Sequence, residues 1–116
     1  MCHALIIEDE FLIADYLAGL METVGVDSSA IAGCGSAAVC AARSQPPDLI
    51  VGDVELGHGD KGPDAVAQIR NELGAIPVIF MTATPEQCAK CDYALAILDK
   101  PIRAERLLAL VRPLAA

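Results

Sequence analysis

Five polar side chains each follow or end a short apolar stretch of this sequence: Glu8, Asp9, Asp53, Thr82 and Lys100. Three carboxylates held close together repel one another, so their ionised form requires a cation or a raised pKa. Mg²⁺ or Mn²⁺ meets this need, because such hard ions prefer oxygen ligands and commonly bind through carboxylates together with a phosphate. A lysine and a hydroxyl beside them would stabilise charge on a transferring phosphoryl group. Asp53 would then be the acceptor, since a carboxylate can act as a covalent nucleophile toward phosphorus.

Alternating strands and helices must position these side chains. The patterns of apolar residues predict strands at 4–7, 26–33, 49–53, 77–81 and 94–98, and helices at 11–24, 36–45, 63–73 and 104–111. Ser36 is expected to cap the second helix, and Leu107, Leu108 and Val111 should face inward from the last one. Strands that are almost entirely apolar are typical of a parallel sheet covered on both faces. Because the carboxyl ends of such strands share one edge, the five polar side chains should converge there.

Composition limits the classes of protein and of partner. The 116 residues predict one domain, and a 54% hydrophobic fraction with only 3% aromatic residues predicts a core of Ala, Val, Ile and Leu. The formal net charge of -8 disfavours nucleic acid or an anionic membrane as a partner. No apolar run is long enough for a membrane span and no basic leader is present, so a cytoplasmic location is expected.

The cysteines agree with a reducing compartment, because their number is odd and no disulfide framework is apparent. Cys88 and Cys91 have the spacing of a redox or zinc motif. No second pair with that spacing and no suitably placed histidine accompanies them, which favours buried, unreactive thiols.

Four motifs together resemble the signature of the CheY-like receiver domain of two-component response regulators. They are Glu8-Asp9-Glu10, the strand end at Asp53, Phe80-Met81-Thr82-Ala83 and Leu98-Asp99-Lys100-Pro101. The resemblance covers essentially the whole chain and implies a flavodoxin-like (βα)₅ fold with strand order 2-1-3-4-5. It also implies Mg²⁺-dependent phosphorylation of Asp53 by a sensor histidine kinase or histidine phosphotransferase, with slow self-catalysed hydrolysis. Such a protein is a signalling receiver rather than a conventional enzyme.

The same resemblance assigns roles to individual residues. Asp9 and Asp53 would hold the metal with the backbone carbonyl of Glu55, and Glu8 would act mostly through water. Thr82 would sense the phosphoryl group and Lys100 would pair with its oxygens. The peptide bond between Lys100 and Pro101 is expected to be cis.

Two features depart from the usual receiver pattern. Ile97 occupies the position where receivers usually carry a switch aromatic, and the interval from Thr82 to Lys100 is short, which implies a short or irregular fourth helix. The stretch 77–86 is similar to the "FAT GUY" subgroup, which includes receivers of general-stress-response regulators. We therefore expect the signal to be read through Thr82 and ordering of the segment 84–93, without an aromatic flip.

The surfaces expected to bind partners are also set by the resemblance. Because the sequence ends shortly after the last predicted helix, a stand-alone receiver, monomeric or homodimeric, with no output domain is expected. A downstream protein would bind the face formed by the fourth helix, the fifth strand and the last helix. Candidates on this face are Tyr93, Ile97, Arg103, Arg106 and Leu110. The kinase would dock on the first helix, with Phe11, Ile13, Ala14 and Leu17 as candidates.

Two other functions remain open from the sequence. A haloacid-dehalogenase-type phosphatase also phosphorylates an aspartate at a strand end, but it needs a second acid two residues later, where Glu55 is a poor match. A pseudo-receiver would bind a partner without being phosphorylated, and the intact set Asp9, Asp53, Thr82 and Lys100 speaks against it.

Overall fold

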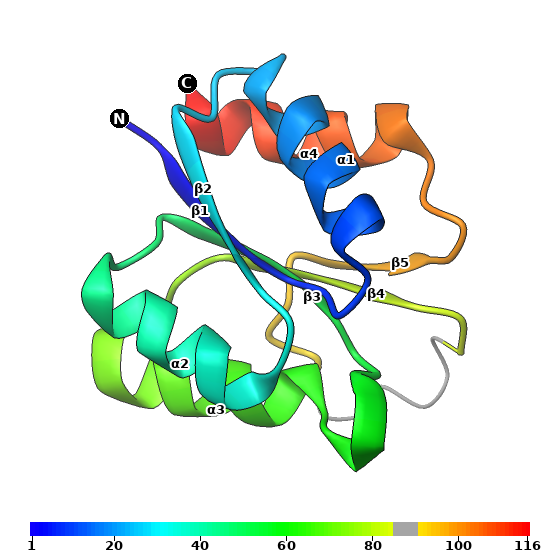
Figure 1. Ribbon diagram of the computed structural model, residues 1–116. Helices are drawn as coiled ribbons and strands as arrows, with labels where there is room; N and C mark the ends of the chain where they lie inside the picture. Colours follow the sequence, from blue (N-terminus) through cyan, green and yellow to red (C-terminus); the bar gives the residue numbers. More distant parts are fainter. Residues whose placement is uncertain (85–90) are drawn as a thin grey trace.

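Strands and helices alternate along the chain in the computed structural model, which describes residues 1–84 and 91–116. The strands are β1 (His3–Ile7), β2 (Ser28–Ala32), β3 (Leu49–Asp53), β4 (Val78–Thr82) and β5 (Ala96–Asp99). The helices are α1 (Phe11–Glu22), α2 (Gly35–Ser44), the 3₁₀ turn η1 (Gly57–Gly59), α3 (Gly62–Leu73) and α4 (Ala104–Ala115). The strands form one parallel sheet in the order β2-β1-β3-β4-β5 (Figure 1). This is the predicted flavodoxin-like arrangement.

Helices cover both faces of the sheet, with α1 and α4 on one side and α2 and α3 on the other (Figure 1). Every residue of the three central strands β1, β3 and β4 is buried, which explains why their sequences are nearly all apolar. From α1 and α4, the buried side chains are Ala14, Leu17, Met21, Leu107 and Val111. From α2 and α3, they are Ala38, Val39, Ala42, Ala65, Val66 and Ile69. The core is therefore mainly aliphatic, as the composition predicts.

The strand register aligns the carboxyl ends of the central strands. Asp53 lies beside Met81, and Thr82 lies beside Asp99. The backbone N–H of Lys100 then donates to the carbonyl of Thr82 at 3.0 Å, which holds the turn after β5 against the end of β4. This pairing brings residues that are far apart in the sequence to one edge of the sheet.

The start of α2 differs from the prediction. The N-cap residue is Cys34 and the helix begins at Gly35, so Ser36 is not the cap. The side chain of Asp60, from the loop after β3, accepts the Gly35 N–H at 2.6 Å. The capping acceptor is thus a carboxylate from a distant loop rather than the nearby hydroxyl of Ser36. Its negative charge is also stabilising next to the positive end of the helix dipole.

The last helix is longer than predicted, because α4 continues through Pro113 to Ala115. Leu114 and Ala115 pack against the core on the α1 side, and this contact extends the helix beyond Val111. Leu107 and Val111 face inward as predicted, whereas Leu108 is only half-buried.

The segment between β4 and β5 contains no helix among residues 82–84 and 91–95. The predicted short fourth helix falls partly on residues 85–90, which lie outside the described residues. No helix in the described part of the chain is both long and apolar enough to span a membrane.

Candidate functional site

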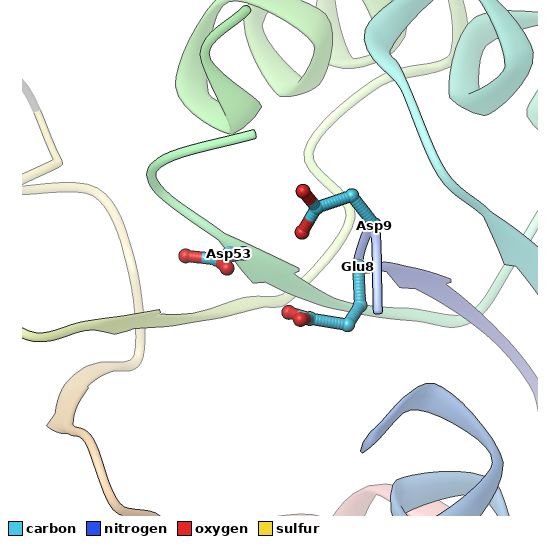
Figure 2. Close-up of side chains that lie close together, drawn as sticks. All are labelled: Glu8, Asp9 and Asp53. Atoms are coloured by element: carbon cyan, nitrogen blue, oxygen red, sulfur yellow. The ribbon is translucent and has the colours of Figure 1, made fainter. Parts of the chain in front are cut away.

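Three carboxylates meet at the carboxyl end of the two neighbouring strands β1 and β3. Glu8 and Asp9 follow β1 directly, and Asp53 is the last residue of β3. Each offers an oxygen atom within 4.8 Å of those of the other two, and Figure 2 shows the side chains pointing toward a common space. Glu8 and Asp53 are buried while Asp9 is exposed, so the cluster is open on one side.

Lys100 supplies the positive charge at this cluster. Its Nζ donates to Oδ2 of Asp53 at 2.6 Å and lies 3.6 Å from Oε2 of Glu8. Burial alone would lower the pKa of Lys100, but the hydrogen bond to Asp53 and the charges of Asp53 and Glu8 outweigh it and raise the pKa above its ordinary value. Lys100 is therefore a fixed cation at neutral pH. The Lys100–Pro101 peptide bond is cis, as the resemblance implies.

Glu8 is the least satisfied group of the cluster. Its side chain is only 1% exposed, and neither carboxylate oxygen has a hydrogen-bond partner among the described residues. Burial, with a further contribution from the adjacent Asp53 carboxyl, raises the pKa of Glu8 to about 7, although the charge of Lys100 acts in the opposite direction. Apart from the ion pair with Lys100, a further cation beside Glu8 would therefore stabilise its ionised form.

The donor set fits a magnesium-type ion. All three side chains offer oxygen, the exposed side at Asp9 gives access to solvent, and the carboxylate of Glu8, which has no hydrogen-bond partner among the described residues, would gain a second positive neighbour besides Lys100. The backbone N–H of Glu55 donates to Oδ1 of Asp53 at 3.1 Å, which places its peptide next to the cluster. The carboxylate of Glu55 instead forms an exposed ion pair with Lys61. The part assigned to its backbone carbonyl stays a prediction.

Thr82 is buried at the end of β4, but its hydroxyl is engaged locally. Its Oγ1 accepts the backbone N–H of Thr84 at 3.1 Å. No hydrogen bond joins Thr82 to Asp53 in the described part of the chain. The structure thus brings Glu8, Asp9, Asp53 and Lys100 into one cluster and leaves Thr82 at its edge.

Comparison with known proteins agrees with this geometry. The family model of the response regulator receiver domain matches residues 4–112. The chain belongs to this family. It is 43% identical over 84 residues to the phyllosphere-induced regulator PhyR of Methylorubrum extorquens, a match that covers 72% of this chain and 31% of that protein. It is 34% identical over 110 residues to the transcriptional regulatory protein PdtaR of Mycobacterium tuberculosis, covering 91% of this chain and 53% of that protein.

Solved structures place the chain close to the PhyR receivers. The solution structure of the PhyR receiver domain of Erythrobacter litoralis has a TM-score of 0.86 at 30% identity, covering 97% of this chain and 88% of that one. The anti-anti-sigma factor PhyR of Bartonella quintana has a TM-score of 0.83 at 32% identity, covering 97% of this chain and 46% of that one. The chain spans about half or less of the length of the curated relatives named above. The predicted likeness to general-stress-response receivers is thereby confirmed.

Gly62 is a residue of this receiver that sequence reasoning missed. It is the first residue of α3, and its N–H donates to the carbonyl of Val54 at 3.0 Å. A Cβ atom at this position would collide with the carbonyl oxygen of Asp53. Only glycine therefore allows α3 to start directly against the backbone of the central aspartate. The glycine-rich sequence 57–62 was a signal for a loop but did not show which glycine is essential.

The predicted switch and partner residues of this receiver separate into two groups. Ile97 and Tyr93 are half-buried against the core under α2 and α3, where Tyr93 packs edge-to-face on Phe80 with ring centroids 6.0 Å apart. Arg103 and Arg106 are exposed at the start of α4. That a partner binds the face formed by these residues stays a prediction.

Two further predictions need qualification by the structure. Ala14 of α1 is fully buried in the core and Leu17 nearly so, which corrects the expectation that Ala14 contacts a kinase, whereas Phe11 is 65% exposed. Cys91 is buried, and its potential partner in a redox or zinc motif, Cys88, lies outside the described residues.

Proposed function

We propose that Asp53 accepts a phosphoryl group from a phosphohistidine of a sensor histidine kinase or histidine phosphotransferase, and that a protein partner reads the result. The observation that carries this proposal is the contact of Lys100 with Asp53 inside the acidic cluster. An ion pair of purely structural purpose would not need two further carboxylates beside it, since they raise the electrostatic cost of the site.

The proposed transfer balances as a simple displacement. An oxygen of Asp53 attacks phosphorus, the phosphorus–nitrogen bond of the phosphohistidine breaks, and the leaving imidazole takes a proton from solvent. Mg²⁺ held by Asp9, Asp53 and the Glu55 carbonyl would neutralise negative charge on the phosphoryl oxygens. Lys100, which contacts Asp53, would donate to one of those oxygens, and the hydroxyl of Thr82 would exchange its bond with Thr84 for a bond to another. Attack of water on the acyl phosphate would later release inorganic phosphate and restore Asp53.

An apolar cavity beside Lys100 supports the approach of the donor. Its volume is about 490 Å³ and its lining residues are Ile13, Tyr16, Leu17, Lys100, Pro101 and Ile102. The adjacent Phe11 and Leu12 are exposed by 65% and 82%, so α1 presents apolar side chains to solvent next to the site. We place the donor domain here, with its histidine directed at Asp53.

The related proteins of known structure bear on which kind of molecule reads the phosphorylated state. The Bartonella relative is named an anti-anti-sigma factor, which suggests a protein rather than DNA as the direct reader for this chain as well. The net charge of -8 agrees with a protein partner. We further propose a cytoplasmic location and a monomer or homodimer.

Phosphorylation with a small donor tests the function. The protein would be incubated with Mg²⁺ and acetyl phosphate, and in parallel with beryllofluoride, and intact mass would be recorded. We expect a single phosphoryl adduct that is absent from Asp53→Asn and from samples containing EDTA. No adduct in the unaltered chain would favour the pseudo-receiver. Rapid turnover of general phosphate esters would favour the phosphatase, although the pairing of Glu55 with Lys61 leaves its carboxylate poorly placed to serve as the second acid.

A further inference from the structure

A second cavity adjoins Lys100 at the turn between β5 and α4. Its volume is about 480 Å³, and its lining residues are Leu98, Asp99, Lys100, Pro101, Arg103 and Arg106. It shares Lys100 and Pro101 with the apolar cavity next to α1 but is otherwise lined by different side chains. The proposed chemistry at Asp53 makes no use of Arg103 or Arg106.

The charge of this cavity is unusual for the molecule. The chain has 8 basic against 16 acidic residues, yet three cations line this one cavity. Elsewhere Arg43 and Lys61 are neutralised by Glu72 and Glu55. Arg103 and Arg106 form no ion pair or hydrogen bond through their side chains with any described residue, and both are exposed. Two unneutralised guanidinium groups are thus left beside a cavity in a strongly acidic protein.

The amino end of α4 adds the positive end of its helix dipole to this cavity, although the first turn also carries the exposed acid Glu105. Arg103 is the N-cap residue and makes no side-chain capping bond, and the first bonds of the helix run from the N–H groups of Arg106 and Leu107 to its carbonyl. The amino end of a helix favours negative charge. Guanidinium groups also bind carboxylates through two parallel hydrogen bonds, which gives them a geometric preference for such a ligand.

Building on the proposed function, we propose that this cavity binds an acidic segment of the protein partner, with carboxylates on Arg103 and Arg106 and an apolar side chain over Leu98 and Pro101. Asp99 in the lining disfavours a compact dianion such as free phosphate, because such an ion cannot avoid that carboxylate. An extended segment can place its carboxylates on the arginines and a neutral residue near Asp99. Half-buried Leu110 continues the same side of α4, one turn beyond Arg106, and lengthens the surface.

A peptide titration followed by NMR tests this proposal. The probe is a twelve-residue peptide in which glutamate and leucine alternate. Its control is the same peptide with lysine in place of every glutamate. With the acidic peptide we expect backbone amide shifts concentrated at residues 98–106, and none there with the basic peptide. Even shifts over the whole surface, or equal response to both peptides, would overturn the assignment.

Matched arginine variants make the test specific. The double variant Arg103→Gln/Arg106→Gln should weaken binding of the acidic peptide about tenfold, since two solvent-exposed ion pairs are removed. Arg112→Gln, an exposed arginine of the same helix outside the cavity, should bind as the unaltered protein does. Equal binding by the double variant and the unaltered protein would refute the site. Addition of inorganic phosphate alone should leave residues 98–106 unshifted, and saturable shifts there would show a free-anion site instead.

The same samples separate this proposal from the proposed function. Asp53→Asn should lose the beryllofluoride adduct and still bind the acidic peptide. If the unaltered protein forms no adduct but binds the peptide through the two arginines, phosphoacceptance fails and the docking cavity stands. If the unaltered protein forms the adduct but does not bind the peptide through the two arginines, the proposed docking site is refuted and the proposed chemistry at Asp53 stands.

Discussion

Replacement of Glu8 by glutamine should stabilise the metal-free protein, and by an amount that depends on pH. The pKa of Glu8 rises from 4.5 to about 7 on folding, chiefly because the side chain is buried. This change corresponds to roughly 3 kcal/mol of folding free energy. Glutamine fills nearly the same space without ionising, so the variant avoids this destabilisation.

The sign follows from which state holds the proton. Below about pH 4.5 Glu8 is protonated in both the folded and the unfolded chain, and the variant gains nothing. Between 4.5 and about 7 the unfolded chain releases its proton while the folded protein keeps it, so the unaltered protein loses stability as pH rises. Above about 7 the loss is complete. The advantage of Glu8→Gln should therefore grow from near zero at pH 4.5 to roughly 3 kcal/mol at pH 8.

Urea unfolding in EDTA at pH 4.5, 6 and 8 measures this difference directly. Glu10→Gln is the control, because it makes the same change at an exposed side chain two residues away. Addition of Mg²⁺ at pH 8 should reduce the advantage of Glu8→Gln, since the ion stabilises the ionised cluster of the unaltered protein. Parallel stability curves for Glu8→Gln and the unaltered protein across this pH range would refute the burial argument.

Three further substitutions, two of them each paired with a control substitution, test the fold and the site. Gly62→Ala should cost about 3 kcal/mol or more in urea unfolding because its Cβ collides with the Asp53 carbonyl. Gly19→Ala, which meets nothing within 4 Å, should gain about 0.5–1 kcal/mol, and a similar result for both would contradict the steric account. Leu107→Ala should cost about 2–5 kcal/mol by leaving a cavity under α4, and half-buried Leu110→Ala clearly less; equal losses would show that α4 packs differently. Lys100→Met should bind Mg²⁺ about tenfold more tightly by calorimetry, because a competing cation is removed, and unchanged affinity would place the ion elsewhere.

The strands of the sheet could be predicted from local signals, whereas their order could not. The runs around Ile6, Ile50 and Ile79 are apolar because these strands are buried on both faces, and this is a property of each segment by itself. The meeting of Glu8 and Asp53 followed in turn, since parallel strands end at one edge. Motif resemblance added the order of the strands, which periodicity alone does not determine.

The errors arose where a distant residue decides local structure. Ser36 is a good N-cap by type, but the carboxylate of Asp60 reaches the first turn of α2 from another loop. Similarly, the helix predicted to end at Val111 continues through Pro113, because Leu114 and Ala115 pack on the core. Such contacts depend on the assembled fold, and a window of sequence around each residue does not contain them.

The environments of Lys100 and Glu8 indicate that the cluster around Asp53 is not arranged for stability alone. If the cluster served folding alone, one lysine would be matched by one carboxylate, and Glu8 would be apolar or would have donors. Instead Glu8 is buried without them, and Lys100 is shared between two acids. The excess negative charge is explained if a divalent cation completes the site, and the same cation would draw in a phosphoryl group that Lys100 then holds. If Mg²⁺ stabilised the Glu8→Gln variant as strongly as it stabilises the unaltered chain, this explanation of the excess negative charge would be refuted. The buried acid would then contribute nothing to the metal site.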